Sequence, residues 1–146
     1  MVKNVLIATD GSELADKALI YGLELARALH AKSTIVTVTE PWVDLAPAEV
    51  SIAFPIEEYE KGAAQMAQHI LSKAAPRAVE EGVSCEVLHV KDQHPAEGII
   101  ETARECGCDL IVMASHGRRG LSRMMLGSQA NKVVAQSSVP VLIWRA

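Results

Sequence analysis

The residues best suited to chemistry lie in one segment near the carboxyl end of the chain, from Ala114 to Val134. Its last glycine, Gly127, is followed by Ser128 at a predicted helix start. From Ala114 to Ser138 there are four cations and no carboxylate, so the rest of the chain carries a net charge of −8 (−4 minus +4). Backbone N–H groups reach a phosphate where side chains are absent, and a helix N-terminus offers unpaired N–H groups. The segment is therefore predicted to bind an anion.

Other motifs in the chain are weaker guides to chemistry. Neither the P-loop pattern G-x-x-x-x-G-K-[ST] nor the dinucleotide pattern G-x-G-x-x-G is present. His116 stands beside Gly117, and a lone loop histidine is interpreted as a structural hydrogen-bonding group rather than a general base. A single C-x-C pair, Cys106 and Cys108, favours core packing over a metal site.

Apolar and β-branched runs alternate with helical patterns along the chain. Strands are predicted at Asn4–Ala8, Thr34–Thr39, Cys85–Val90, Leu110–Ala114 and Val139–Trp144. Helices are predicted from Ser12 as N-cap to about His30, from Ile56 to about Glu81 with a kink or break at Pro76, at Glu97–Cys106 and at Ser128–Gln136. Glu40–Pro55 is predicted to be a long loop. This alternation predicts an α/β fold with a parallel sheet covered on both faces.

In such sheets a ligand lies beyond the carboxyl ends of the strands, where the winding direction reverses. The turn Thr9–Ser12 follows the first strand, and the glycine-rich segment follows the fourth. If those two strands are neighbours, Asp10 faces the anion-binding loop across one crevice. Asp10 could instead only cap the helix that follows it.

Length and composition limit the setting. A chain of 146 residues is expected to form one domain spanning residues 1–146. The sequence shows neither a secretory signal nor an apolar run long enough to cross a membrane, and three cysteines cannot all pair. A cytoplasmic protein without membrane insertion is expected. The net charge of −4 and the absence of basic stripes argue against nucleic acid as a partner.

The spacing of the glycines identifies a family resemblance. Ala114, two residues, Gly117, nine residues and then Gly127-Ser128 match the motif G-x-x-G-x9-G-[ST], with alanine in place of the first glycine. The sequence resembles the universal stress protein family, in its nucleotide-binding branch. The resemblance covers essentially the whole chain, including the turn after the first strand and the final PVLIWR segment.

The resemblance implies a single Rossmann-like domain with a five-stranded parallel sheet in the order 3-2-1-4-5, and ATP lying across the crevice. Asp10 would contact the adenosine part and Val38 would contact adenine through its backbone. The backbone N–H groups of the glycine motif would hold the phosphates. Apart from the resemblance, a Mg²⁺ ion bound to the phosphates is expected, because the loop supplies no carboxylate of its own to hold a metal. The full set of expected ligand-binding residues is Ala8, Thr9, Asp10, Val38, Met113, Ala114, His116, Gly117, Arg118, Gly127, Ser128 and Gln129.

The expected function is that of a small ATP-binding regulator or signalling module in stress response. The alternatives are a slow ATPase, against which the lack of a P-loop lysine argues, and an interaction protein that has lost its nucleotide. The β-carbon of Ala114 either crowds the phosphate or is harmless in an extended backbone. The apolar final strand Val139–Trp144 is expected to pair two copies as a homodimer.

Overall fold

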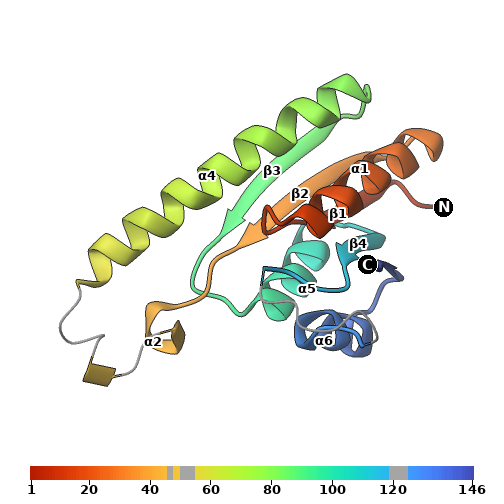
Figure 1. Cartoon of the computed structure of the whole chain (residues 1–146). Helices are drawn as coiled ribbons and strands as arrows, with labels where there is room; N and C mark the ends of the chain where they lie inside the picture. Colours follow the sequence, from red (N-terminus) through yellow and green to blue (C-terminus); the bar gives the residue numbers. More distant parts are fainter. Residues whose placement is uncertain (46–47, 50–54, 119–124) are drawn as a thin grey trace.

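The computed structural model describes residues 1–45, 48–49, 55–118 and 125–146. Its five strands form one parallel sheet in the order β3-β2-β1-β4-β5, which confirms the predicted order (Figure 1). The strands are β1 (Asn4–Ala8), β2 (Lys32–Val38), β3 (Cys85–Val90), β4 (Leu110–Ala114) and β5 (Val141–Trp144). Because β1 pairs with both β2 and β4, the winding direction reverses beside β1.

Helices cover both faces of this sheet, as predicted. The described residues form α1 (Glu13–Ala28), α4 (Ile56–Glu80), α5 (Pro95–Glu105) and α6 (Ser128–Gln136), which cover the sheet, and the short α2 (Trp42–Leu45), which has no buried residue. Residues of α1 and α4 share one apolar cluster with the sheet, and residues of α5 and α6 share another. In Figure 1, α4 lies beside β3 and its first turns extend beyond the ends of the strands, near α2.

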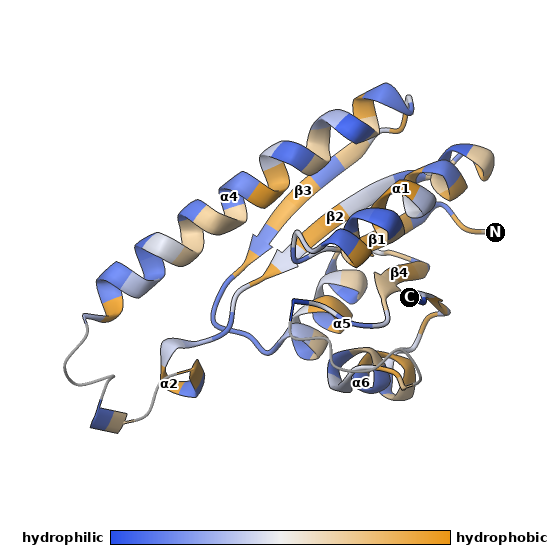
Figure 2. Cartoon of the chain, in the orientation of Figure 1, coloured by the Kyte–Doolittle hydropathy of each residue, from blue (hydrophilic) through white to orange (hydrophobic). Residues whose placement is uncertain are grey.

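The alternation of side chains along β1 builds the two cores. Val5 and Ile7 belong to the cluster under α1 and α4, whereas Leu6 and Ala8 belong to the cluster under α5 and α6. All of β1 is buried, as expected for a strand covered on both faces. Figure 2 shows hydrophobic residues along the strands, whereas α4 carries hydrophobic and hydrophilic residues in alternation.

Most element boundaries follow the sequence prediction, and the start of α1 is a direct example. Ser12 is the N-cap, and its hydroxyl oxygen accepts a hydrogen bond from the N–H of Ala15 at 3.3 Å. Strands β1, β3 and β4 and helix α6 have the predicted bounds. Among the described residues, no helix has the length and apolar character needed to cross a membrane.

Proline explains two of the differences from the prediction. Pro76 does not break α4, which runs through it. The proline lies on the exposed side, where the carbonyl that loses its partner faces water, while Leu71, Ala74 and Ala78 hold the inner face in the core. Helix α5 begins at Pro95 rather than Glu97, because proline fits the first helical position, where its missing N–H has no bond to lose.

Other differences are shifts of strand ends and one short helix. Strand β2 covers Lys32–Val38 instead of Thr34–Thr39. Strand β5 begins at Val141 instead of Val139, because the N–H and carbonyl of Val139 are bonded to the Ser137 hydroxyl in a turn. The predicted loop Glu40–Pro55 contains the four-residue helix α2, and residues 46–47 and 50–54 of that loop lie outside the described part.

Candidate functional site

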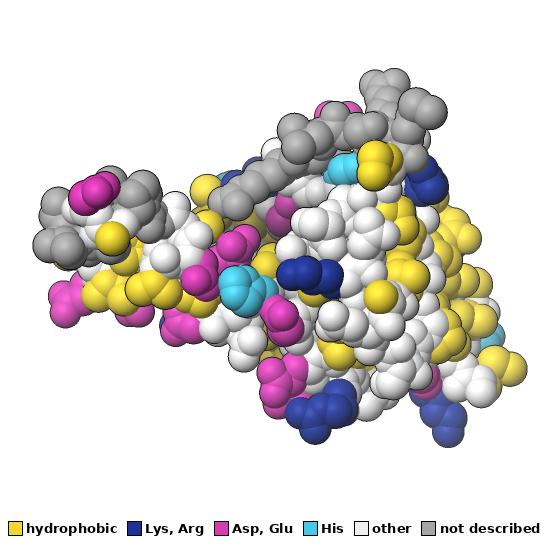
Figure 3. All heavy atoms as spheres, turned by 90° about the horizontal axis from the view of Figure 1, so that it is seen from below, with side chains coloured by type: hydrophobic (Ala, Val, Ile, Leu, Met, Phe, Trp, Pro, Cys, Tyr) yellow, Lys and Arg dark blue, Asp and Glu magenta, His cyan; other side chains and the backbone are white. Residues whose placement is uncertain are grey.

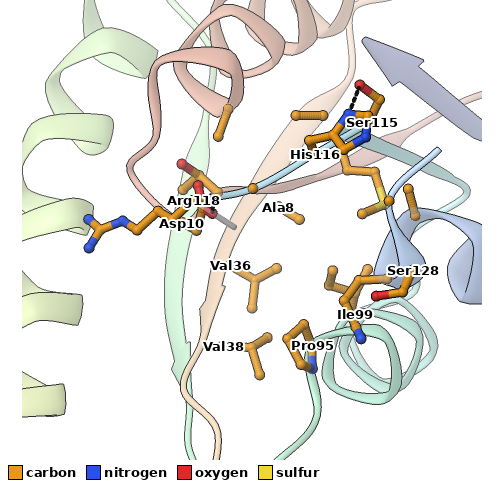
Figure 4. Close-up of a pocket in the computed structure, with 18 of the residues that line it drawn as sticks. Ala8, Asp10, Val36, Val38, Pro95, Ile99, Ser115, His116, Arg118 and Ser128 are labelled. Atoms are coloured by element: carbon orange, nitrogen blue, oxygen red, sulfur yellow. Dashed lines mark hydrogen bonds between the residues drawn. The ribbon is translucent and has the colours of Figure 1, made fainter. Parts of the chain in front are cut away.

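A hollow of about 420 Å³ opens at the carboxyl ends of the strands, where the winding direction reverses. The ends of β1, β2 and β4 form its floor, and the first turns of α5 and α6 form one side (Figure 4). All of the residues expected to bind ligand line it: Ala8, Thr9, Asp10, Val38, Met113, Ala114, His116, Gly117, Arg118, Gly127, Ser128 and Gln129. The fold thus brings the predicted set together, and their role as ligand contacts stays a prediction.

The carboxylate of Asp10 joins the two segments that form the crevice. Its Oδ1 accepts a hydrogen bond from the N–H of Ser12 at 2.9 Å, and its Oδ2 accepts one from the N–H of Arg118 at 2.8 Å. These bonds fix the turn after β1 to the loop after β4, although the residues are 108 positions apart. Asp10 is therefore not the cap of α1, a position that belongs to Ser12.

Two motif glycines are explained by close approach of the chain to itself. A β-carbon on Gly117 would collide with Oδ2 of Asp10. A β-carbon on Gly127 would lie 2.7 Å from the carbonyl oxygen of Ser115, the same oxygen that accepts a hydrogen bond from the Gly127 N–H at 2.8 Å. Real β-carbons do not approach oxygen this closely, so a backbone oxygen excludes a side chain at Gly127 even before a ligand is considered. A side chain in place of Gly117 would have to displace the Asp10 carboxylate.

The N-terminus of α6 is open toward the hollow. Its N-cap, Gly127, has φ −61° and ψ 158° and offers no side-chain hydrogen bond to the helix. Ser128, Gln129 and Ala130 form the first turn and line the hollow, and this turn contains no acidic residue. The first N–H groups of a helix lack partners inside the helix and carry partial positive charge. This end of α6 can accordingly hold an anion through its backbone.

Ala114, the position where the motif has glycine, ends strand β4. It is paired with Trp144 in the sheet and is 9% exposed. Its side chain packs in the apolar cluster under α1, on the opposite face of the sheet from α6. The backbone is that of an ordinary strand, which alanine adopts as readily as glycine.

The positive charge expected near the phosphates does not come from Arg118. Its side chain leads away from the hollow toward α4, and its Nη2 lies 3.7 Å from Sδ of Met66 (Figure 4). Arg119 and Arg123 lie outside the described residues. The attraction for an anion that the described residues offer is that of backbone N–H groups at a helix end.

His116 has the structural contact that the sequence suggested. Its Nδ1 lies 3.0 Å from the hydroxyl oxygen of Ser115, and its ring is close to Gly127. The ring lies on the β5 side of the hollow, near Ser115 (Figure 4).

Most of an apolar wall of the hollow was missed by sequence reasoning. Val36 and the predicted Val38 of β2 face Pro95 and Ile99 of α5 across it (Figure 4). These side chains can take the faces of a flat, largely apolar ring. The signal that could have found them is Pro95 itself, which marks a helix start at the carboxyl edge of the sheet. The other lining residues not predicted are Ala15, Glu40, Ser115 and Ala130.

Acidic side chains lie on several parts of the surface. Figure 3 shows them on the body of the molecule and also on the part that projects from it, where α2 and the start of α4 lie. Asp44 of α2 and Glu57 and Glu58 of α4 belong to this region. The first turn of α6 itself has no acidic residue, although Asp10 and Glu40 also line the hollow.

The described residues contain no group of three or more His, Cys, Asp or Glu side chains that could hold a metal ion. Burial raises the pKa of the Cys106 and Cys108 thiols, which disfavours the thiolate form that binds metals. These two cysteines instead pack with the apolar cluster under α5 and α6.

Comparison with known proteins decides the family. The sequence profile of the Universal stress protein family matches residues 1–145. The chain belongs to this family. Universal stress protein YxiE of Bacillus subtilis is 35% identical over 149 residues, which cover 99% of this chain and 100% of that protein.

Solved structures of universal stress proteins share the fold. Protein MJ0577 of Methanocaldococcus jannaschii is 25% identical with a TM-score of 0.81, covering 100% of this chain and 97% of that one. A universal stress protein solved in complex with cAMP is 27% identical with a TM-score of 0.72, covering 97% of this chain and 95% of that one.

Proposed function

We propose that the protein binds ATP in the hollow and acts as a small cytoplasmic regulator in stress response. The observation that carries this proposal is the open N-terminus of α6, which meets the hollow with unpaired N–H groups and no acidic residue in its first turn. A relative of the same fold was solved with an adenine nucleotide, cAMP, which supports the class of ligand.

The hollow suggests how ATP would lie. The phosphates would accept hydrogen bonds from the N–H groups of Ser128 and Gln129, and adenine would enter the apolar wall next to Val38 and Pro95. The ribose would lie near Asp10, whose carboxylate has lone pairs left after its two backbone bonds. Mg²⁺ would enter with the phosphates, because the described residues offer no metal-binding group of their own.

Substitution of Ser128 tests the phosphate contact with little change to the fold. Ser128→Pro removes the backbone N–H at the first position of α6, where proline is well tolerated. The preceding Gly127 already has the extended backbone that proline requires (φ −61°, ψ 158°). We expect ATP affinity, measured by calorimetry, to fall roughly tenfold or more for the loss of one charge-assisted hydrogen bond. Ser128→Ala keeps the N–H and serves as the matched control, with a loss of at most a few fold.

The outcomes separate the proposal from its alternatives. Equal affinity of the two variants for ATP would mean that the N–H of Ser128 does not hold a phosphate. Wild-type protein that neither binds ATP nor gains thermal stability from it would support an interaction protein that has lost its nucleotide. Conversion of bound ATP to ADP during the titration would support the slow ATPase.

We also propose that two copies pair through β5. This strand lies at the edge of the sheet, next to β4, and its residues are partly exposed. The carbonyls of Pro140 and Trp144 accept hydrogen bonds from β4 and its following turn, so by alternation the N–H and C=O of Val141 and Ile143 point outward. An apolar edge with free backbone groups favours pairing with a second such edge.

A further inference from the structure

We infer that Gln129 is a positioning residue, whose side chain ties the first turn of α5 to the first turn of α6. Its Oε1 accepts a hydrogen bond from the N–H of Ala96 at 3.0 Å. The two turns carry different parts of the hollow, since α5 supplies the apolar wall and α6 supplies the open backbone N–H groups. The consequence for ligand binding rests on the proposed function, whereas the contact itself does not.

The first turn of α5 needs a partner from outside its own helix. Its N-cap, His94, makes no side-chain hydrogen bond to the helix, and Pro95 has no N–H to offer. Ala96 is fully buried, at 0% exposure, so its N–H cannot turn to solvent. A buried N–H without a partner is costly, and Gln129 supplies the missing acceptor. The residue that caps α5 therefore belongs to α6.

The contact orients Gln129 as well as α5. Only the carboxamide oxygen can accept from an N–H group, so the NH₂ of the same side chain remains as a donor at the rim of the hollow. The backbone N–H of Gln129 belongs to the open first turn of α6. One residue is thus placed to fix the position of the wall formed by Pro95 and Ile99 relative to the anion-binding end of α6.

The neutral charge of Gln129 is also part of its role. A glutamate at this position could accept the same hydrogen bond from Ala96. It would, however, place a negative charge at the N-terminal ends of two helices. That charge would offset the partial positive charge of the helix ends, which otherwise attracts a phosphate. Glutamine caps α5 and leaves the positive end of α6 available to an anion.

Two substitutions of Gln129 separate the cap from the charge. Gln129→Met keeps the length of the side chain but removes the acceptor, and Gln129→Glu keeps the acceptor but adds a charge. Gln136→Glu makes the same change of charge in the last turn of α6, at an exposed position, and is the matched control. The readouts are hydrogen exchange of the Ala96 amide in the ligand-free protein and the affinities for ATP and for adenosine.

In Gln129→Met, exchange of the Ala96 amide should rise at least about tenfold, because its hydrogen bond is lost. The affinities for ATP and adenosine should both fall, because the apolar wall is no longer held in position relative to α6. In Gln129→Glu, protection of Ala96 and affinity for adenosine should stay near wild type, while affinity for ATP falls roughly tenfold. Gln136→Glu should change none of the three.

Unchanged exchange of Ala96 in Gln129→Met would overturn the inference, whatever the nucleotide results. Equal losses of ATP and adenosine affinity in Gln129→Glu would overturn the role given to charge. If the wild-type protein binds neither ligand, the proposed function fails. The exchange contrast between Gln129→Met and Gln129→Glu still decides whether Gln129 caps α5.

Discussion

The carboxylate of Asp10 fixes two turns at once, and a glycine makes room for it. One oxygen holds the turn after β1 through Ser12, and the other holds the loop after β4 through Arg118. The second oxygen occupies the space that a β-carbon on Gly117 would need. Asp10 and Gly117 therefore act as a pair, and each should change the cost of substituting the other.

A double-mutant cycle tests this pair. Gly117→Ala should lower the free energy of unfolding by about 1–3 kcal/mol in the wild-type background, because the new methyl group meets the Asp10 carboxylate. In Asp10→Ala protein the same substitution should cost much less, since the colliding oxygen is gone. Urea unfolding of the four proteins measures both costs.

Gly62→Ala is the control for this cycle. Gly62 lies in α4 with no atom within 4 Å of an added β-carbon, so alanine there should stabilise the protein by about 0.5–1 kcal/mol in either background. Equal costs of Gly117→Ala with and without the Asp10 carboxylate would show that the two residues do not interact.

Individual residues also show how far the site could be predicted from the sequence. The spacing of Gly117, Gly127 and Ser128 placed them correctly around one hollow. It could not reveal that an oxygen atom of the protein lies where a β-carbon on either glycine would be, because that depends on the path of the loop. It also could not reveal where the Arg118 side chain points: this residue lines the hollow, but its guanidinium reaches Met66 on α4.

At the scale of secondary structure, a second carboxylate holds strands β1 and β4 together at their amino ends. Both carboxylate oxygens of Asp109 accept a hydrogen bond from the N–H of Lys3, each at 3.0 Å. Its Oδ1 also accepts one from the N–H of Asn4 at 3.1 Å. Burial alone raises the pKa of Asp109, but the N–H groups of Asn4 and Lys3, aided by the N-terminal ammonium, outweigh it and leave the pKa below its usual value.

Because the pKa of Asp109 is lower in the folded protein, its charged form stabilises the fold. The contribution of Asp109 is present above the pKa of the unfolded chain, about 3.9, and is lost as the pH falls through the lower folded value. Asp109→Asn should therefore be destabilising at pH 7, and its cost should shrink as the pH falls below the pKa of the unfolded chain and the carboxyl of the wild type becomes protonated. Urea unfolding across this range measures the difference. Glu24→Gln, an exposed change on α1, is the control, and a loss for Asp109→Asn that is the same at every pH would contradict the role of its charge.

The elements themselves were largely predictable, because their signals are local. The buried run of β1, the Ser12 cap and the bounds of α6 follow from the residues of each segment alone. Some differences depend on residues that are close in sequence, as at the starts of α5 (Pro95) and β5 (Ser137), and others depend on a distant contact. Helix α4 passes through Pro76 because its inner face is held in the core, and α5 is capped by Gln129 of another helix. Neither contact is visible in the local pattern.

At the scale of the whole molecule, the edge strand β5 carries the proposal of a homodimer. Ile143→Pro removes an N–H that points outward, without removing a bond to β4, so it should convert a dimer into a monomer. Ile143→Val keeps this N–H and should leave the dimer in place. Sedimentation at several protein concentrations measures both. A wild-type protein that is monomeric at all concentrations, or an Ile143→Pro dimer of unchanged strength, would contradict pairing through this edge.

The sheet order was predictable only through the family resemblance, because the alternation of strands and helices fits more than one winding. The alternation of strands and helices alone predicted a parallel sheet covered on both faces, and the structure confirms this prediction. The neighbouring position of β1 and β4 then brings Asp10 to the loop after β4.

The bond between Asp10 and the Arg118 amide has a consequence for biosynthesis. The ribosome adds Arg118 to the chain 108 residues after Asp10. The nascent chain therefore cannot complete the hollow before the loop after β4 has been synthesised. If ATP is the ligand, its capture would report that a newly made chain has reached its mature topology.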